Sequence, residues 1–273
     1  MTSTFIGVAG LPRAGSTLLC QLLAQHPEID CEGHSSPLCN ALRMLRRFVS
    51  DDEFMLAQLD AQFDRSYGNL RNAMRGFLQG WHAASGKSVV VDKSRAWLNS
   101  IDMLLHLEPG ARLLIPIREL GQIYGSIEAQ HQKTVLLDFA DHLADFDRLG
   151  RADQLFAGDK AIGAPLASIR AVADLPQTVR ERLYFVKFED LMRDPVDVMS
   201  AVFGWLGMPS CDIDVEALPG LPHESDSHYR FKYPHRRRDR LVAPHHHDIP
   251  VSIQQRIETV CDWYYAWFYP AGG

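Results

Sequence analysis

Apolar residues occur along this chain in short runs, and each run is followed by a stretch with helical spacing. Four runs, at positions 5–9, 88–91, 112–117 and 183–187, predict strands. None of them alternates regularly with polar residues, so we expect both faces of each strand to be buried. Pro116 interrupts the third run, and because proline lacks the N–H that a ladder needs, it is expected at a sheet edge or a bulge.

Amphipathic helices are predicted after these strands. Apolar residues recur every three or four positions over 17–25, 97–107, 121–130 and 196–206, which leaves one apolar stripe on each helix. Strands that alternate with helices indicate βαβ units. The predicted fold class is therefore α/β, with three layers, a central mostly parallel sheet and helical insertions.

Two long stretches between strands, 41–80 and 134–174, are predicted as the helical insertions, and 208–250 is predicted as a long loop. The aromatic end, 253–269, is expected to form a closing helix whose rings pack in the core. No linker divides the chain, which predicts a single domain over residues 1–273.

The composition is that of an ordinary soluble globular protein, with 46% hydrophobic and 23% charged residues among 273. The odd number of scattered cysteines, without a C-x-x-C pair, argues against a disulfide framework and a zinc ribbon and suits a reducing compartment. No basic and apolar leader precedes the first strand, so neither a signal peptide nor a membrane span is expected, and the predicted location is cytoplasmic. The cysteines are Cys20, Cys31, Cys39, Cys211 and Cys261.

The formal net charge of −6 argues against nucleic acid as a general partner. The stretch 230–240 nevertheless carries six Lys and Arg residues against one acid, Asp239. A basic segment on an acidic chain indicates a specific anionic ligand, although a solvated basic loop is the alternative.

A glycine-rich loop connects the first strand to the first helix: Gly10-Leu-Pro-Arg-Ala-Gly-Ser-Thr17. Glycines allow a tight turn there, and the helix N-terminus offers unpaired N–H donors to a phosphate. The loop differs from the nucleoside-triphosphate pattern G-x-x-x-x-G-K-[ST], because Ser16 stands where the lysine belongs. The loss of this lysine argues against ATP or GTP as the ligand. A cation is still present three positions earlier, at Arg13, and can lie over a 5′-phosphate.

A second anion site is predicted after the third strand. Arg118 follows its last residue, and an arginine at the carboxyl end of a parallel strand points into the crevice where such sheets bind ligands. Ser126, eight residues on, can donate to the same phosphate from the next helix. The alternative for Arg118 is an ion pair with Glu119 or Glu128.

Three segments together resemble the sulfotransferases that use 3′-phosphoadenosine-5′-phosphosulfate (PAPS). Residues 12–17 fit P-[KR]-[SA]-G-[ST]-T, residues 118–126 fit R-[DE/N]-x₆-S, and residues 188–195 fit [YF]-E-D-L-x-x-[DN]-P. The style of the motifs is most similar to tyrosylprotein sulfotransferases and bacterial relatives. The resemblance implies a P-loop-like fold, PAPS as donor, 3′-phosphoadenosine-5′-phosphate (PAP) as product, and no required metal.

The resemblance also implies the residues that hold the nucleotide. Many relatives have a nucleotide-contacting tyrosine where this chain has Phe188, so Tyr184 is considered as its replacement. Relatives close the 3′-phosphate with a basic loop near the C-terminus, for which 229–238 is the candidate. The implied set is Pro12, Arg13, Ala14, Gly15, Ser16, Thr17, Leu18, Arg118, Ser126, Tyr184, Lys232 and Arg236.

Sulfuryl transfer needs a cation over the bridging oxygen and a base for the acceptor hydroxyl. The cations are Arg13 and Lys93, a position where relatives carry a lysine; the alternative for Lys93 is an ion pair with Asp92. Alignment with the tyrosylprotein segment H-P-x-[IV]-x-C-x-E-E gives His34 as the first candidate for the base and Glu32 as the second. The alternative is that neither residue takes the proton and that both only shape the acceptor pocket.

Other readings remain open. Positions 89–92 resemble a Walker B strand, whose Asp92 would hold Mg²⁺ in a kinase that uses ATP. A non-catalytic nucleotide-binding or partner-binding module of the same fold is a further alternative. The expected acceptor is a peptide tyrosine, with carbohydrate, lipid or small-molecule hydroxyls as alternatives. The three histidines 245–247 are read as a polar loop, because consecutive histidines do not easily face one metal ion.

Overall fold

The computed structural model describes residues 3–139, 142–220 and 238–270. Its centre is a five-stranded parallel sheet in the order β2-β3-β1-β4-β5. The predicted α/β fold is confirmed, and all four predicted strands are present. The additional edge strand β2 has two residues, which is too short to leave a hydrophobic pattern. The strands are β1 Thr4–Val8, β2 Ile29–Asp30, β3 Val89–Lys93, β4 Arg112–Ile117 and β5 Leu183–Lys187.

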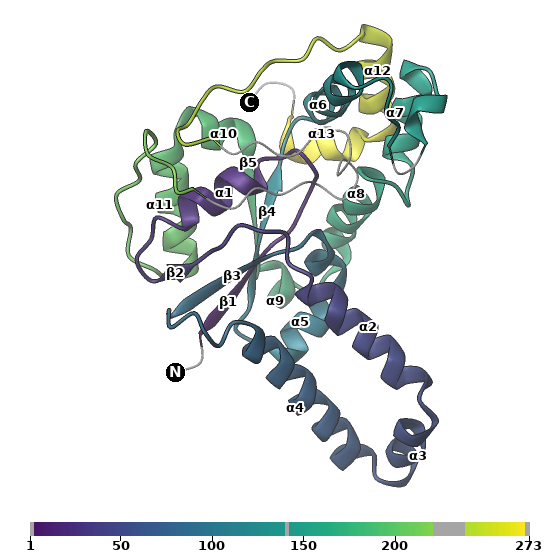
Figure 1. Cartoon of the computed structure of the whole chain (residues 1–273), viewed down its shortest axis with the longest axis vertical. Helices are drawn as coiled ribbons and strands as arrows, with labels where there is room; N and C mark the ends of the chain where they lie inside the picture. The colour runs from purple at the N-terminus through teal and green to yellow at the C-terminus, as the bar shows by residue number, and fades with distance from the viewer. Residues whose placement is uncertain (1–2, 140–141, 221–237, 271–273) are drawn as a thin grey trace.

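Helices cover both faces of the sheet, as Figure 1 shows with α1, α10 and α11 to its left and α6, α8 and α13 to its right. Successive side chains of β1 alternate between the two layers: Phe5 packs with Trp97 in one core, and Ile6 packs with Leu19 in the other. Burial on both faces explains why the strand is apolar throughout. The bounds are α1 Ser16–Leu23, α6 Leu120–Lys133, α8 Gly163–Arg170, α10 Phe188–Arg193, α11 Pro195–Leu206 and α13 Asp262–Phe268.

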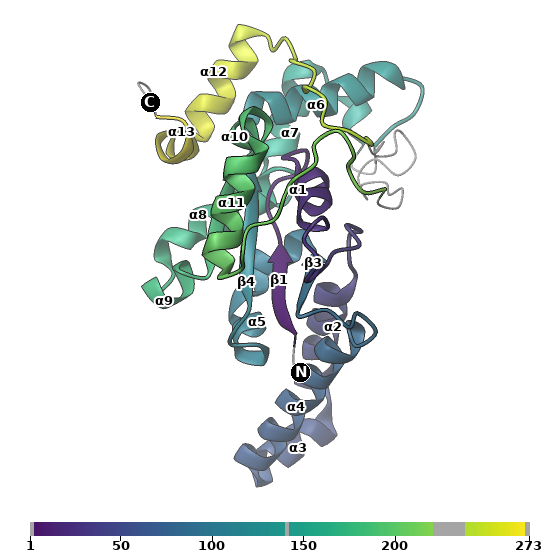
Figure 2. The ribbon, with the colours of Figure 1, turned by 90° about the vertical axis from the view of Figure 1, so that its left-hand side faces the viewer.

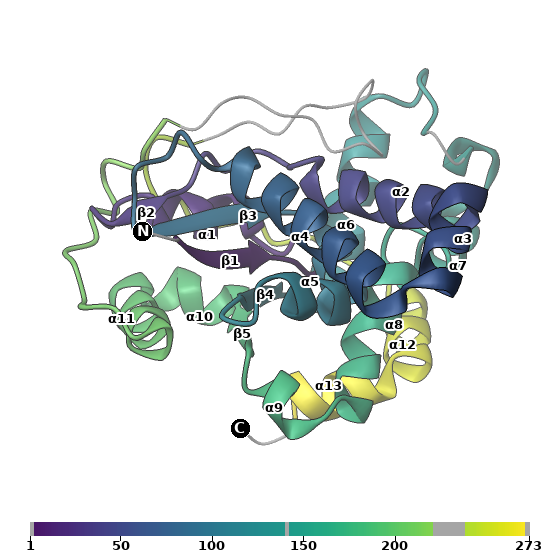
Figure 3. The ribbon, with the colours of Figure 1, turned by 90° about the horizontal axis from the view of Figure 1, so that it is seen from below.

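The first predicted insertion forms an arm of three helices that extends away from the sheet (Figures 1 and 2). These are α2 Leu38–Asp51, α3 Glu53–Ala61 and α4 Phe63–Trp81. Helix α4 packs against α5 (Ile101–Leu107). The predicted helix 97–107 is divided in two, because its first part belongs to the 3₁₀ helix η1 (Arg95–Ser100) and only the rest forms α5. Seen from below, the arm lies on the side of the sheet opposite α11 (Figure 3).

The second insertion is also helical, and the chain closes with two helices instead of the single one predicted. The break falls at Cys261, between α12 (Val251–Val260) and α13. Tyr264 is fully buried as expected, whereas Trp267 is 44% exposed, so core packing does not hold for every aromatic side chain here. The second insertion comprises η2 Leu143–Asp145, α7 Arg148–Phe156, α8, η3 Ala171–Asp174 and α9 Gln177–Arg180.

The prediction that Pro116 lies at an edge or a bulge is wrong. Strand β4 lies between β1 and β5, and its pairing with β5 continues through Pro116 and Ile117. The proline is tolerated because its nitrogen faces β1 beyond the last ladder contact, which Ala9 makes with Leu114. The missing N–H therefore removes no ladder bond.

The described parts of 208–250 contain neither helix nor strand, in agreement with the predicted loop. Within the described ranges, none of the helices combines the length and the apolar character that crossing a membrane requires.

Candidate functional site

A cavity of about 1040 Å³ lies where the carboxyl ends of β1, β3 and β4 meet. Open parallel sheets bind ligands in this position. Four segments far apart in the sequence contribute to its wall: the loop after β1, the segment around Lys93, the start of α6, and the chain from Arg238 to His247. All but one of the predicted loop residues 12–18 line it, whereas Ala14 is buried in the core.

The loop after β1 has the backbone that an anion site needs. Gly10 has a φ of 118° and Gly15 a φ of 89°, conformations that favour glycine. A Cβ on Gly10 would approach the carbonyl oxygen of Pro116 to 2.6 Å, and one on Gly15 would collide with the ring of Phe188. Helix α1 begins directly after Gly15 without a side-chain cap, so its first N–H groups are directed at the cavity.

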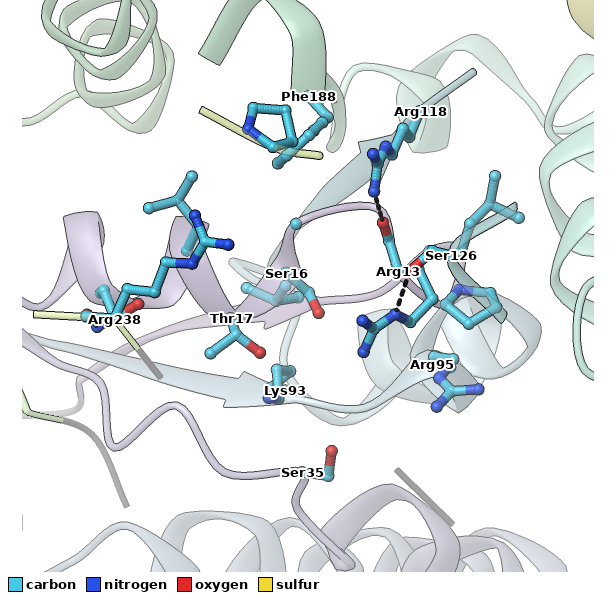
Figure 4. Close-up of a pocket in the computed structure, with 18 of the residues that line it drawn as sticks. Arg13, Ser16, Thr17, Ser35, Lys93, Arg95, Arg118, Ser126, Phe188 and Arg238 are labelled. Atoms are coloured by element: carbon cyan, nitrogen blue, oxygen red, sulfur yellow. Dashed lines mark hydrogen bonds between the residues drawn. The ribbon is translucent and has the colours of Figure 1, made fainter. Parts of the chain in front are cut away.

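Arg13 links the two predicted phosphate sites, as Figure 4 shows. Its Nε donates to Oγ of Ser126 at 3.0 Å, and its carbonyl oxygen accepts from the guanidinium of Arg118 at 3.0 Å. Arg13 also adopts a φ of 59°, which is unfavourable for a residue with a Cβ. The structure therefore holds this loop in a strained conformation that brings three predicted residues together.

Arg118 is directed to the cavity by the surrounding elements. Its side chain lies over the ring of Phe188, with its guanidinium carbon 4.6 Å from the ring centre. Burial lowers the pKa of Arg118, Glu189 opposes this effect and the nearby Arg13 adds to it. The two acids considered as ion-pair partners are engaged elsewhere: Glu119 caps α6 by accepting from its first N–H groups, and Glu128 is paired with Arg151 at 2.7 Å.

Lys93 is buried in the cavity wall at the end of β3, with 7% of its surface exposed. The preceding Asp92 lies outside the cavity lining. Its carboxylate accepts from Nε1 of Trp97 at 2.6 Å and lies 3.5 Å from the ring of His82. This core position differs from what a kinase requires, since a Walker B aspartate must reach a metal at the phosphates.

The segment with the two base candidates runs alongside Lys93. Ser36 donates its N–H to the carbonyl oxygen of Lys93 at 2.8 Å, and the backbones of Ser35 and Lys93 pair in an isolated parallel β-bridge. Ser35, Ser36 and Asn40 line the cavity. His34 is half-buried and Glu32 is exposed, and both lie outside this lining, so the structure brings their segment, but not these two side chains, to the cavity wall.

The C-terminal basic segment reaches the cavity at Arg238, the last residue of the predicted stretch 229–238. Arg238 and Arg240 line it, together with His245 and His247, whereas Lys232 and Arg236 lie outside the described residues. Burial, followed by the positive fields of His245, Arg118 and Arg13, lowers the pKa of His247 to about 4. Tyr184 is directed away from the site, because its ring packs against Trp205 of α11.

The charge of the lining is uniform. Seven Lys and Arg side chains contribute, and within the described part of the chain no Asp or Glu does. Although the protein has a net charge of −6, the charged side chains that line this cavity within the described residues are basic, which favours an anionic ligand. Arg95 and Lys133 were not predicted as site residues, because neither belongs to a recognisable motif in the sequence. The cations are Arg13, Lys93, Arg95, Arg118, Lys133, Arg238 and Arg240.

Comparisons with known proteins identify the family and the fold. A model of the sulfotransferase family matches residues 6–212. The sulfotransferase domain from the curacin biosynthetic pathway superposes with a TM-score of 0.54 at 15% identity, over 96% of this chain and 98% of that one. Sulfotransferase STF9 from Mycobacterium avium superposes with a TM-score of 0.51 at 18% identity, over 98% of this chain and 78% of that one. At such identities the two structures establish a shared fold.

Proposed function

Because the chain belongs to the sulfotransferase family, we propose that residues 1–273 form one domain that transfers the sulfuryl group of PAPS to an acceptor hydroxyl. The family match confirms the resemblance seen in the motifs, while the nearer likeness to tyrosylprotein sulfotransferases stays a prediction. The observation that supports PAPS most strongly is the contact of Arg13 with both Ser126 and Arg118, in a cavity whose described charged side chains are basic.

We assign the nucleotide to two anion sites that share Arg13. The loop N–H groups and the start of α1 are proposed to hold the 5′-phosphosulfate. Arg118 and Ser126 are proposed to bind the 3′-phosphate, because a planar guanidinium and a hydroxyl suit its oxygens. Phe188, beneath Arg118 and against Gly15, offers an apolar surface for the adenosine in the place of the tyrosine of many relatives. From the basic segment, the described Arg238 and Arg240 line the cavity and are proposed to face the nucleotide, while Lys232 and Arg236 stay predictions.

In the proposed reaction the acceptor oxygen attacks sulfur in line, and the bond between sulfur and the 5′-phosphate oxygen breaks. The electron pair of that bond stays on the phosphate and yields PAP. Lys93 and Arg13 stabilise the charge that grows on the leaving oxygen. The acceptor proton passes to a base, for which His34 is the first candidate and Glu32 the second.

The proposed acceptor is a hydroxyl compound, with a peptide tyrosine as the expectation from the motif style and a carbohydrate, lipid or small molecule as alternatives. The domain from the curacin pathway belongs to a biosynthetic pathway, which supports the small-molecule alternative. We propose cytoplasmic action, in keeping with reduced cysteines. A kinase is less well supported, because Asp92 is committed to Trp97 in the core.

Calorimetric titration with PAP, AMP and ATP tests this proposal. We expect micromolar binding of PAP without Mg²⁺, and binding of AMP at least tenfold weaker because AMP lacks the 3′-phosphate. Tight ATP binding that depends on Mg²⁺, with no preference for the 3′-phosphate, would contradict the proposal and favour the kinase.

A further inference from the structure

The three-helix arm, residues 38–81, concentrates the exposed apolar side chains of the molecule. Among the described residues, eighteen large hydrophobic side chains are exposed; eight of them lie on the arm, and six of those eight are aromatic. Single exposed apolar residues are ordinary, but such a concentration indicates a surface that another molecule covers. The eight residues are Met44, Phe48, Phe54, Leu56, Phe63, Tyr67, Phe77 and Trp81.

Helix α3, at the far end of the arm (Figure 1), shows most clearly that a covering surface is missing. Four of its nine residues are Phe54, Met55, Leu56 and Leu59, yet the described chain buries none of the nine. Phe54 is 72% exposed. A helix this apolar is ordinarily buried, because removing apolar surface from water is the main driving force of folding and association.

A row of aromatic side chains runs along α4. Its four members are separated by four, ten and four positions, so at about 100° per residue they lie within about 80° of one another around the helix. Met74 and Leu78, on one edge of this stripe, are buried, whereas the four rings remain 41–59% exposed. Helix α4 is about 28 Å long, so a partner that covers the rings must lie along it, as a second helix does. The four are Phe63, Tyr67, Phe77 and Trp81.

The exposed area of the arm matches what one protomer contributes to a stable dimer. Eight side chains of roughly 200 Å² each, exposed by 41–72%, leave about 800 Å² of apolar surface. A standard interface buries about 800 Å² per partner, of which only a little more than half is apolar. The arm therefore has enough apolar surface for such an interface even when part of it faces elsewhere.

Charge along the arm is segregated by position. The far end, residues 51–64, carries five acids and no Lys or Arg, whereas the two stretches that lead back to the sheet, 38–50 and 66–81, carry five arginines and no acid. Nine of these ten side chains are exposed. The acids are Asp51, Asp52, Glu53, Asp60 and Asp64, and the arginines are Arg43, Arg46, Arg47, Arg71 and Arg75.

This segregation makes the arm complementary to itself. Two arms laid antiparallel bring the acidic end of each onto the arginines of the other, whereas two parallel arms oppose like charges. The same acids surround Phe54, one of the most exposed side chains of the arm, and they disfavour its insertion into an anionic membrane surface.

We propose that the arm is the interface of a symmetric dimer, in which the partner is a second copy of this chain and the two arms lie antiparallel about a two-fold axis. Each contact then occurs twice, and the acidic, apolar end of one arm packs on the basic, aromatic face of the other. None of the residues that carry this inference lines the cavity, so it is independent of the proposed sulfuryl transfer.

Sedimentation velocity and native mass spectrometry over the micromolar range test the dimer. We expect the mass of two copies, with a dissociation constant in the micromolar range or below. Phe54→Ser should raise this constant tenfold or more without lowering the thermal unfolding midpoint of the monomer, because Phe54 packs in no core of the described chain. Leu136→Ser is the matched control, since Leu136 is 95% exposed outside the arm, and should leave the constant unchanged.

A pair of charge-reversed variants tests the antiparallel arrangement without assuming a register. One carries Asp60→Lys with Asp64→Lys, and the other carries Arg47→Glu with Arg71→Glu. Each variant alone should dimerise at least tenfold more weakly than the wild type, because like charges then meet. An equal mixture should form a heterodimer at least tenfold tighter than either homodimer. Thermal unfolding of each variant checks that it is folded.

A wild type that stays monomeric overturns the inference. If that monomer floats with vesicles of phosphatidylcholine and phosphatidylserine, the surface serves a membrane instead of a second copy. A dimer that Leu136→Ser weakens as much as Phe54→Ser has its interface outside the arm. Folded charge-reversed variants that do not pair on mixing overturn the antiparallel arrangement.

Discussion

The hydroxyl of Tyr264 bonds to both backbone groups of Arg118. It donates to the carbonyl oxygen of Arg118 at 2.9 Å and accepts from its N–H at 3.3 Å. Tyr264 is fully buried, and burial raises its pKa well above the usual value. The closing helix α13 therefore fixes the end of β4 at the residue proposed to bind the 3′-phosphate.

Tyr264→Phe should lower stability and PAP affinity together. Two buried backbone groups would lose their partner, at a cost of about 1–3 kcal/mol in the free energy of unfolding, and the freed Arg118 should bind PAP about tenfold more weakly. Denaturant unfolding and calorimetry measure the two effects. Tyr124→Phe is the control, because the Tyr124 hydroxyl is buried and donates to the carbonyl oxygen of Arg148; equal weakening of PAP binding in this control would contradict a specific role for Tyr264.

At position 13 we expect glycine to give a more stable protein than alanine, which is the reverse of the usual order. At most positions glycine is less stable than alanine because it loses more backbone entropy. At Arg13 a φ of 59° disfavours any Cβ, so Arg13→Gly should unfold with a free energy about 1 kcal/mol higher than Arg13→Ala. Both variants should lose about 100-fold or more in sulfuryl transfer because the cation is gone. A less stable glycine variant would show that the loop is not strained.

Lys93 should affect the reaction more than nucleotide binding. PAP lacks the sulfuryl group beside which we propose that Lys93 lies, so Lys93→Met should change PAP affinity only about threefold. The rate of a single turnover with radiolabelled PAPS should fall about 100-fold. Comparable losses in both measurements would place Lys93 at the nucleotide and not at the transferred group.

The base assignment can be tested by two conservative substitutions. If His34 takes the acceptor proton, His34→Asn should lower kcat about 100-fold or more with little change in PAP affinity, while Glu32→Gln should stay near the wild type. The opposite result would assign the base to Glu32. Unchanged rates in both variants would mean that neither residue is the base and would direct the search to the residues that line the cavity.

Much of the fold and half of the site could be predicted, because they depend on residues that are close together in the sequence. The buried strands are continuous apolar runs, and the loop 10–17 combines glycines, a cation and a helix start in one segment. Arg95, Gln130 and Lys133 could not be predicted, because helix packing alone decides that they reach the cavity. Tyr184 is the opposite case, a residue that was predicted in the site but lies outside it. Its ring points to Trp205, and no sequence motif shows which face of a strand is turned to the site.

We expect His247 to make the stability of the protein depend on pH. Its pKa of about 4 in the free protein lies below the value of about 6.5 for an ordinary histidine. Between these two pH values the unfolded chain binds more protons at this residue than the folded chain does. The stability that neutral His247 contributes is therefore fully present above pH 6.5 and is lost as the pH falls toward 4. His247→Gln should remove this part of the acid sensitivity, which denaturant titrations at pH 7 and pH 4.5 measure.

PAP should raise the pKa of His247, because its phosphates offset the positive fields of Arg118 and Arg13 that disfavour the imidazolium. A pKa that is higher in the complex means that binding takes up a proton between the free and bound values, so this residue should favour PAP as the pH falls through that window. NMR titration of the His247 ring with and without PAP measures the shift. His247→Gln should show a smaller proton uptake by calorimetry in buffers of different ionisation enthalpy. An unchanged pKa in the complex would mean that the nucleotide phosphates do not lie beside Arg118 and Arg13.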